Sequence, residues 1–236
     1  MKILVIIVSH EFSLQYKQNI SILNNFMHQI TNEVDYVGIS CLDDFHHYTD
    51  IISFQHTIIN PKKQFSKICE FITDYKETLN YDWYIKIRPD VLLFDNIPFH
   101  QLSINSINAR ARTYYGPRHI LYGCSIGGKG CHSNINDCYY DTYEHKIVLD
   151  DHIFIFHKNV IDNGAFDIFT NEDNLPENET LHSKIWNDRN VPLNVIGINM
   201  VLTKYNTYSG HIPKNLLQLQ NQNQNKKRNF RKMLLI

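Results

Sequence analysis

Three consecutive residues, Arg88, Pro89 and Asp90, have the types and the placement that chemistry on a charged ligand requires. They follow residues 83–87, which predict a buried strand, and ligands of open α/β sheets bind beyond the carboxyl ends of the strands. A carboxylate there can hold Mg²⁺ or Mn²⁺, because these ions prefer oxygen ligands and need few from the protein when phosphates supply the rest. Pro89 has a fixed φ and no N–H donor, so it ends the strand and holds Asp90 at its tip. Arg88 could neutralise a phosphate or hold a carboxylate with its planar guanidinium.

The elements that must position these residues alternate between strands and helices. Continuous apolar runs are typical of buried parallel strands, and apolar residues three and four apart indicate amphipathic helices. This alternation predicts an α/β fold with a mostly parallel central sheet flanked by helices. In chain order, we expect a strand at 2–9, a helix at 12–32, strands at 34–40 and 51–59, a helix at 65–80 and a strand at 83–87.

The pattern is less regular after Asp90. Residues 114–144 are rich in Gly, Cys, Asn and Tyr without a clean period, which predicts a long loop. Residues 217–236 are rich in Asn and Gln and basic, which predicts a flexible tail behind a single domain over residues 1–216. The other expected elements are strands at 106–113, 151–157 and 193–202, a short helix or turn at 160–169 and a helix at 176–189.

An ordered set of motifs resembles the GT-A-like glycosyltransferases of polysaccharide synthesis. Residues 81–91, Tyr-Asp-Trp-Tyr-Ile-Lys-Ile-Arg-Pro-Asp-Val, look like the Arg-x-Asp variant of the family's Asp-x-Asp motif, with Arg88 in place of the first Asp. Residues 108–112 resemble the Ala-Arg-x-Arg-like strand that follows it, and residues 149–154 resemble an acidic strand start. The resemblance covers roughly residues 1–205 and implies a GT-A-like, Rossmann-like fold that binds a nucleotide-sugar donor.

The resemblance also implies roles for individual residues. Asp90 would bind a metal–diphosphate with Mn²⁺ or Mg²⁺, and Asp150 or Asp151 would face the acceptor, one of them as base in an inverting enzyme. Ser9 and His10 would lie near the nucleotide. The remaining candidates are Arg110 and Arg112 for phosphate or sugar contact, His211 as second metal ligand or phosphate contact, and Lys214 for phosphate.

Each of these residues also has a purely structural interpretation. Asp90 could cap the turn that follows its strand, and Asp150 and Asp151 could form a solvated turn. Arg110 and Arg112 could be explained by one buried ion pair. His211 could be an ordinary loop histidine.

Three further patterns are weaker indications of a site. Residues 43–47, Asp-Asp-Phe-His-His, could hold a metal or form a surface loop. Residues 123–129 have the glycine and lysine spacing of a P-loop, but Gly130 stands where the Mg²⁺-binding hydroxyl is needed, so a flexible acceptor loop fits better. Cys124, Cys131 and Cys138 are spaced too widely for the usual zinc pairs.

Composition narrows the partners and the cellular setting. The net charge is −1 and the isoelectric point about 6.9, which does not favour nucleic acid as a partner. Five cysteines and the absence of an 18-residue apolar run favour a cytoplasmic protein. Lys226, Lys227 and Arg228 of the tail could contact an acidic membrane surface, or belong to a short disordered end.

The sequence therefore predicts a hexosyltransferase-type enzyme that moves a sugar from a nucleotide donor to a hydroxyl of a glycan or glycolipid. Two alternatives stay open. A sugar nucleotidyltransferase would usually carry a Gly-rich basic loop after the first strand, where this chain has Ser9-His10-Glu11-Phe12. A non-catalytic carbohydrate-binding protein on a GT-A shell would bind glycans without hydrolysing a donor.

Overall fold

The computed structural model describes the backbone of residues 1–115, 119–124, 145–167, 186 and 189–203. Side chains are described for the same residues except 111–115, 119–124 and 145–150. The predicted helix at 176–189, the tail at 217–236, and His211 and Lys214 therefore lie wholly or almost wholly outside the described residues. None of the helices in the described ranges is long and apolar enough to cross a membrane.

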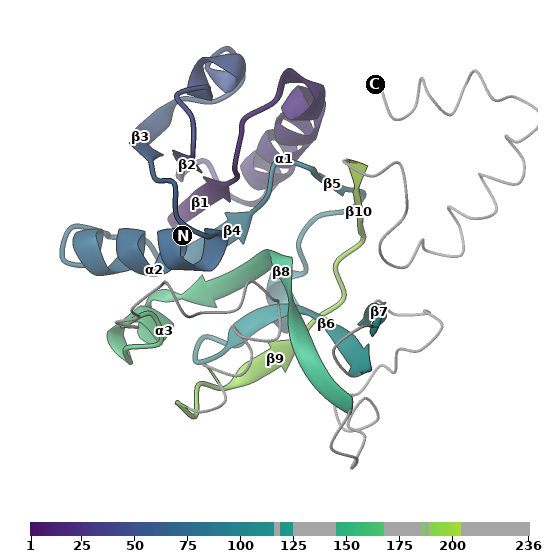
Figure 1. The fold of residues 1–236 in the computed structure, drawn as a ribbon. Helices are drawn as coiled ribbons and strands as arrows, with labels where there is room; N and C mark the ends of the chain where they lie inside the picture. Colours follow the sequence, from purple (N-terminus) through teal and green to yellow (C-terminus); the bar gives the residue numbers. More distant parts are fainter. Residues whose placement is uncertain (116–118, 125–144, 168–185, 187–188, 204–236) are drawn as a thin grey trace, which may run out of the picture.

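The larger sheet has a parallel half and a largely antiparallel half (Figure 1). Its strands follow the order β3-β2-β1-β4-β8-β6-β7, and β9 pairs with β6. The first four strands in this order are parallel, β8 is antiparallel to both β4 and β6, and β7 is antiparallel to β6. The strands are β1 (Ile3–Val8), β2 (Val34–Ser40), β3 (Phe54–Ile59), β4 (Trp83–Ile87), β6 (Ile107–Tyr115), β7 (His119–Cys124), β8 (His145–His157) and β9 (Leu193–Val195).

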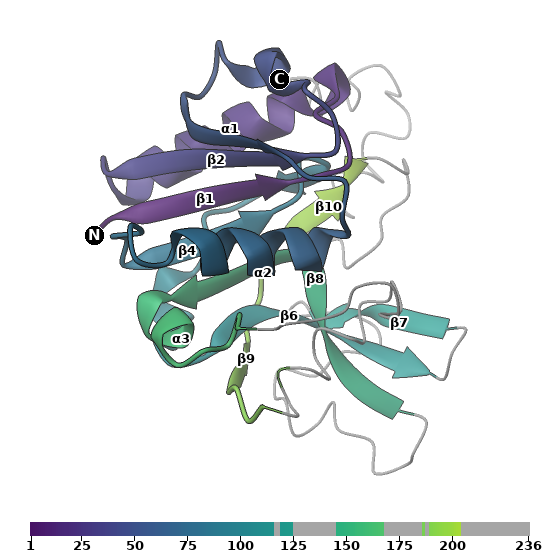
Figure 2. The same cartoon turned by 60° about the vertical axis from the view of Figure 1, so that its left-hand side comes forward.

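Two helices cover opposite faces of the parallel half, which explains why β1 is apolar at every position. Figure 2 shows α2 (Gln64–Tyr75) in front of the sheet and α1 (Lys17–Ile30) behind it. Ile3, Val5 and Ile7 pack into the core on the α1 side, whereas Leu4 and Ile6 pack on the α2 side. The α/β prediction is confirmed, and four of the seven pairings in the larger sheet are parallel.

A second, two-stranded sheet lies beyond the end of β4. It pairs β5 (Val91–Leu93) with β10 (Met200–Leu202) in antiparallel fashion. The predicted strand at 193–202 is therefore two strands, because its first part pairs with β6 and its last part with β5. The shorter helices are η1 (Leu14–Tyr16), η2 (Phe45–Tyr48), η3 (Phe99–Gln101) and α3 (Lys158–Asp162).

The structure departs from the expected elements at several other boundaries. β7 lies inside the segment predicted as a long loop, and is formed by pairing with β6 rather than by a local pattern. The helix expected at 65–80 ends at Tyr75, and β3 begins only at Phe54. β8 begins at His145, so the acidic residues lie within a strand and not in a turn before it.

An aromatic cluster fixes the loops that follow β1 and β2. The Phe12 ring lies 5.0 Å from the Phe45 ring and 5.2 Å from the Tyr48 ring, measured between centroids. Gly38 makes this packing possible, because a Cβ on Gly38 would lie 2.8 Å from Cδ1 of Phe45. These contacts hold the two loops next to the edge where β1 and β2 end.

Candidate functional site

The carboxyl ends of β1, β2 and β4 meet at one edge of the parallel half, and most of the described candidate residues gather there. Ser9 and His10 follow β1, and Arg88, Pro89 and Asp90 follow β4. This is the edge at which open α/β sheets bind ligands.

Arg88 and Asp90 form a two-pronged ion pair. Arg88 donates through Nε to Oδ1 of Asp90 at 2.9 Å and through Nη2 to Oδ2 at 2.6 Å. The side chain of Asp90 is 4% exposed and that of Arg88 is 15% exposed. Both carboxylate oxygens accept from the guanidinium, so the pair has one fixed relative geometry, as bidentate Arg–carboxylate pairs do. The second of the two roles expected for Arg88, holding a carboxylate, is the one that the structure shows.

The backbone of the same turn is held from two other parts of the chain. Asn19 of α1 is buried and donates through Nδ2 to the carbonyl oxygen of Pro89, at 2.9 Å, and to Oγ1 of Thr203, also at 2.9 Å. Thr203 follows β10, and its backbone N–H donates to the carbonyl oxygen of Asp90 at 2.8 Å. These bonds fix the position of the Arg88–Asp90 pair relative to the sheet.

The acidic segment of β8 lies beside this turn because β8 pairs with β4 up to Ile153, and the pairing of β8 with β6 is irregular at the same point. The register between β6 and β8 passes from Ala109↔Phe154 to Ala111↔Leu149, so residues 150–153 oppose the single residue Arg110. Bulges of this kind redirect side chains and are common next to active sites. Arg110 is buried at this point, 1% exposed, and Asp150 and Asp151 both lie within the bulge.

Hydrogen bonds from β4 connect the bulge to the Arg88 turn. The backbone N–H of Arg88 donates to the carbonyl oxygen of His152 at 3.0 Å. Lys86, which is 1% exposed, donates through Nζ to the carbonyl oxygen of Asp151 and to Oε1 of Gln64. The Asp151 side chain is 14% exposed and its Oδ1 lies 3.7 Å from Nδ1 of His152. Asp151 thus has a partly shielded side chain, and its backbone carbonyl, which Lys86 bonds, adjoins the carbonyl of His152 that accepts from Arg88.

A second buried lysine orders the ends of β1 and β2. Lys67 of α2 is 0% exposed and donates through Nζ to the carbonyl oxygen of Ser9 at 2.7 Å and to Sγ of Cys41 at 3.1 Å. Nδ1 of His10 lies 3.4 Å from the same sulfur. In the part of the chain that the structure describes, no carboxylate forms an ion pair with Lys67. The ammonium therefore adds positive charge to the edge at which Ser9 and His10 lie.

The acidic cluster at 43–47 is part of the scaffold. Asp44 accepts hydrogen bonds from Oγ of Ser40 at 3.0 Å and from the backbone N–H of Phe12 at 2.6 Å, so it joins the loops after β1 and β2. Burial and the charge of Asp44 raise the pKa of Tyr48, whose hydroxyl donates to the carbonyl oxygen of Ser13 at 2.9 Å. Within the described ranges, no three His, Cys, Asp or Glu side chains gather closely enough to hold a metal ion.

The structure brings together part of the predicted site. Arg88 and Asp90 follow β4, Asp151 lies on the neighbouring strand β8 and Arg110 on β6 beyond it, and Ser9 and His10 follow β1. For Asp150 and Arg112 the structure describes the backbone and not the side chain, so only their positions on β8 and β6 are known. His211 and Lys214 lie wholly outside the described residues.

Sequence reasoning missed the two lysines and the bulge. Both lysines interrupt otherwise apolar patterns, Lys67 between Phe65 and Ile68 and Lys86 between Ile85 and Ile87. A charge on a buried face is a usable signal, because such a charge needs a polar partner. The bulge has no local signal, since it exists only through the pairing of β8 with β6.

Comparisons with known proteins find remote structural similarity. Neither a protein-family model nor a curated protein sequence matches it. A solved structure of CMP:2-keto-3-deoxy-manno-octonic acid synthetase complexed with CTP is 11% identical, covers 84% of this chain and 90% of its own, and has a TM-score of 0.43. A glycosyltransferase involved in glycosylation of the major capsid of PBCV-1 is 8% identical, covers 84% and 81%, and has a TM-score of 0.42. The similarity is one of general α/β arrangement, and it assigns no role to any residue.

Proposed function

We propose that the protein is a nucleotide-sugar-dependent glycosyltransferase that transfers a sugar to a hydroxyl of a glycan or glycolipid. The observation that carries this proposal is the Arg88–Asp90 pair at the end of β4 with Asp151 on the neighbouring strand. A guanidinium with a fixed orientation and a partly shielded carboxylate are two groups that such a transfer can use.

Arg88 is proposed to neutralise the departing diphosphate. In the transfer, the bond between the anomeric carbon and the diphosphate oxygen breaks while a bond from that carbon to the acceptor oxygen forms. Negative charge grows on the diphosphate as this happens, and a preorganised cation stabilises it strongly. Asp90 fixes the guanidinium by two hydrogen bonds, so no side-chain reorganisation is needed when the charge develops.

Asp151 is proposed to accept the proton of the acceptor hydroxyl, with Asp150 as the second candidate. A general base must be held within hydrogen-bond reach of the hydroxyl that it deprotonates. The hydrogen bond from Lys86 of β4 to the carbonyl of Asp151 holds the bulge against β4. Ser9 and His10, ordered by Lys67, are proposed to contact the nucleotide.

Mn²⁺ or Mg²⁺ at this edge remains part of the proposal, with Asp90 and His211 as the protein ligands. Each oxygen of Asp90 already accepts from Arg88, so a cation would use a second lone pair on one of them or replace one of the two bonds. A bound divalent ion would supply charge stabilisation of the diphosphate, the same chemistry that Arg88 supplies.

A donor-binding and turnover assay tests the proposal. UDP-, GDP-, CMP- and dTDP-sugars are screened by thermal shift with and without Mn²⁺, and those that bind are assayed for donor hydrolysis and transfer. A ligand at about 100 times its Kd should add about 2.7 kcal/mol of stability. Absence of any nucleotide effect on the folded protein would overturn the proposal. Turnover of a nucleoside triphosphate with a sugar phosphate would assign a nucleotidyltransferase, and glycan binding without donor hydrolysis would assign a binding protein.

A further inference from the structure

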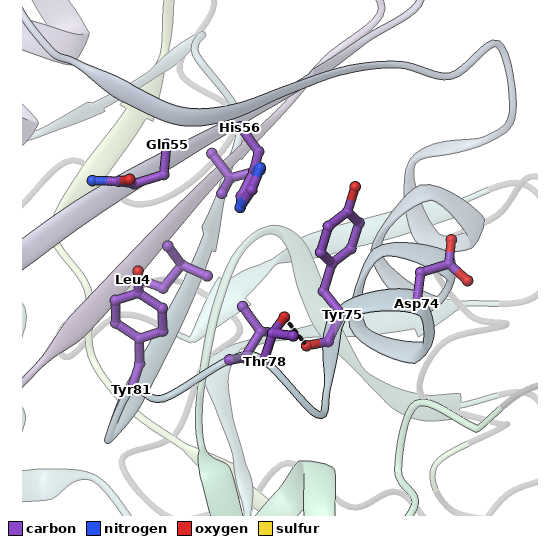
Figure 3. A pocket seen from close by; sticks show the side chains of 9 residues that line it. Leu4, Gln55, His56, Asp74, Tyr75, Thr78 and Tyr81 are labelled. Carbon is purple, nitrogen blue, oxygen red and sulfur yellow. Dashed lines mark hydrogen bonds between the residues drawn. The ribbon is translucent and has the colours of Figure 1, made fainter.

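A separate pocket lies on the α2 face of the sheet, toward the amino ends of β1 and β4. Its volume is about 460 Å³, and it lies between β3 and the end of α2 (Figure 3). Tyr75 ends α2, Tyr81 precedes β4, and Leu4 is near the start of β1. The candidate site described above is at the carboxyl ends of these strands, so the two sites are at opposite ends of the sheet.

The pocket is lined mainly by aromatic rings and polar side chains. Leu79 is partly buried and adds apolar surface, whereas Leu4 and Val37 border the pocket but are 1% and 0% exposed. The rings of His56 and Tyr75 lie 5.2 Å apart at 42°, and Figure 3 shows both at the pocket together with Tyr81. Half-buried aromatic rings offer a flat surface on which the apolar face of a ligand can pack.

The hydrogen bonds already made around the pocket leave both acceptors and donors for a ligand. The hydroxyl of Tyr81 donates to Oδ2 of Asp35 at 2.8 Å, and Nε2 of Gln55 donates to Oδ1 of the same carboxylate at 2.9 Å. The hydroxyl of Thr78 donates to the carbonyl oxygen of Tyr75 at 2.9 Å. Tyr81 and Thr78 keep oxygen lone pairs that can accept, and Gln55 keeps its amide oxygen and one N–H. Hydroxyl groups of a ligand, which can both donate and accept, match these groups.

The charge of the pocket excludes the donor nucleotide as its natural ligand. No Lys or Arg is among the residues that line it in the described part of the chain, whereas Asp74 contributes an exposed carboxylate. A phosphate would meet this carboxylate without a compensating cation. A neutral ring with one apolar face and several hydroxyl groups matches both the aromatic walls and the acceptors, and the volume is in the usual range for small-molecule sites.

We propose that this pocket binds a neutral saccharide, with a face of the sugar ring on Tyr75 and His56 and its hydroxyls donating to Tyr81, Gln55 and Asp74. The site is distinct from the catalytic edge, and the proposal does not depend on the transferase activity. In an enzyme that extends a glycan, such a pocket would hold a part of the chain remote from the reacting hydroxyl.

Saturation-transfer NMR and titration calorimetry with neutral methyl glycosides and disaccharides test the proposal. We expect at least one neutral sugar to bind, and Tyr75→Ala to weaken it about tenfold, as loss of an aromatic contact does. Asp74→Asn and His56→Ala change exposed side chains, so they test the same pocket if Tyr75→Ala does not fold. Tyr81→Phe keeps the ring and removes the hydroxyl, and we expect weaker binding here as well.

Asp90→Asn at the opposite end of the sheet is the control. We expect it to reduce donor turnover and leave saccharide binding unchanged, which separates failure of this inference from failure of the proposed function. Saccharide binding that survives all pocket variants but is lost in Asp90→Asn would overturn the inference. So would the absence of binding to any neutral sugar, or preferential binding of a trimethylammonium cation, on folded protein.

Discussion

Arg88 and Asp90 face each other across a single proline and share two hydrogen bonds, of 2.9 and 2.6 Å, in a nearly buried setting. Both residues had been singled out as ligands of a diphosphate or a metal. The structure makes them one unit, in which the carboxylate holds the cation. A change in either residue therefore alters both.

Asp90→Asn should lower donor turnover by about 10²–10³-fold, the usual cost of losing one preorganised charge-stabilising group. The amide nitrogen cannot accept, so one of the two bonds from Arg88 is lost and the guanidinium is less firmly oriented. Steady-state kinetics with saturating donor measure the effect. Asp50→Asn is the matched control, because Asp50 also pairs with a basic residue, Lys17, but at the surface. Equal losses in the two variants would contradict the role given to Asp90.

Asp151→Asn should reduce kcat by about 10²–10⁴-fold, the range typical of general-base loss, and leave the Kd of the donor unchanged. The reason is that the carboxylate is proposed to act on the acceptor and not on the nucleotide. Parallel measurement of Asp150→Asn decides which acid of the bulge is the base. A loss of donor affinity equal to the loss of kcat would show that Asp151 acts in donor binding instead.

Lys67→Met should lower the free energy of unfolding by about 1–3 kcal/mol, because the partly buried carbonyl oxygen of Ser9 loses its donor. It should also weaken nucleotide binding, since Ser9 and His10 lose their support. Denaturant unfolding and nucleotide titration measure the two effects. Lys76→Met is the control. Lys76 follows α2 and forms only a surface ion pair with Asp167, so its replacement should change neither the free energy of unfolding nor nucleotide binding much. If Lys67→Met changed neither stability nor nucleotide binding, Lys67 would not position Ser9 and His10.

Gly38→Ala should destabilise the fold by about 1–3 kcal/mol through overpacking. The new Cβ would lie 2.8 Å from the Phe45 ring and 3.1 Å from the Phe54 ring. Chemical denaturation of Gly38→Ala, of Phe45→Leu and of the double variant forms a mutant cycle. We expect the double variant to be less destabilised than the sum of the single variants, and strict additivity would refute the contact as the cause.

Stability should fall above about pH 10 because buried tyrosines resist ionisation in the folded state. Burial raises the pKa of Tyr84 to about 12, and it also raises the pKa values of Tyr36 and Tyr81. The unfolded chain loses these protons first, so the contribution of Tyr84 is complete below pH 10 and is lost as the pH rises toward 12. The expected slope is about 1.4 kcal/mol per pH unit for each such group.

Urea unfolding at a series of alkaline pH values measures this slope. Tyr84→Phe keeps the ring that stacks on Phe156, at 5.2 Å and 5°, and removes the titrating hydroxyl. We expect its stability to depend less steeply on pH. If the dependence of stability on pH were unchanged in this variant, groups other than Tyr84 would cause the loss of stability at alkaline pH.

Much of the parallel half could be predicted from local pattern. The predicted bounds of β2 and β4 are confirmed, because polar residues flank both segments and β-branched and aromatic residues are frequent within them. The prediction that Arg88 could hold a carboxylate is confirmed as well. This pairing could be predicted locally too, since only Pro89 separates Arg88 from Asp90.

The largely antiparallel half of the sheet could be predicted less well, because pairing between segments distant in sequence decides its structure. β7 is paired with β6, and the bulge consists of a change in register between β6 and β8. The partners of Lys67 and Lys86 include carbonyl groups distant in sequence, which no spacing rule could identify. The roles of the metal, of His211 and of Lys214 stay predictions.

The bulge of β8 also has a consequence for how the protein can diverge. Gain or loss of one residue between Leu149 and Phe154 would rotate the acidic side chains while leaving the flanking pairs with β6 in register. The pairs of residues 154–157 with β4 would be kept too. The bonds of Arg88 and Lys86 to the backbone of His152 and Asp151 would have to change. A small insertion here would therefore move the acidic residues relative to Arg88, while the strand pairing on either side is kept.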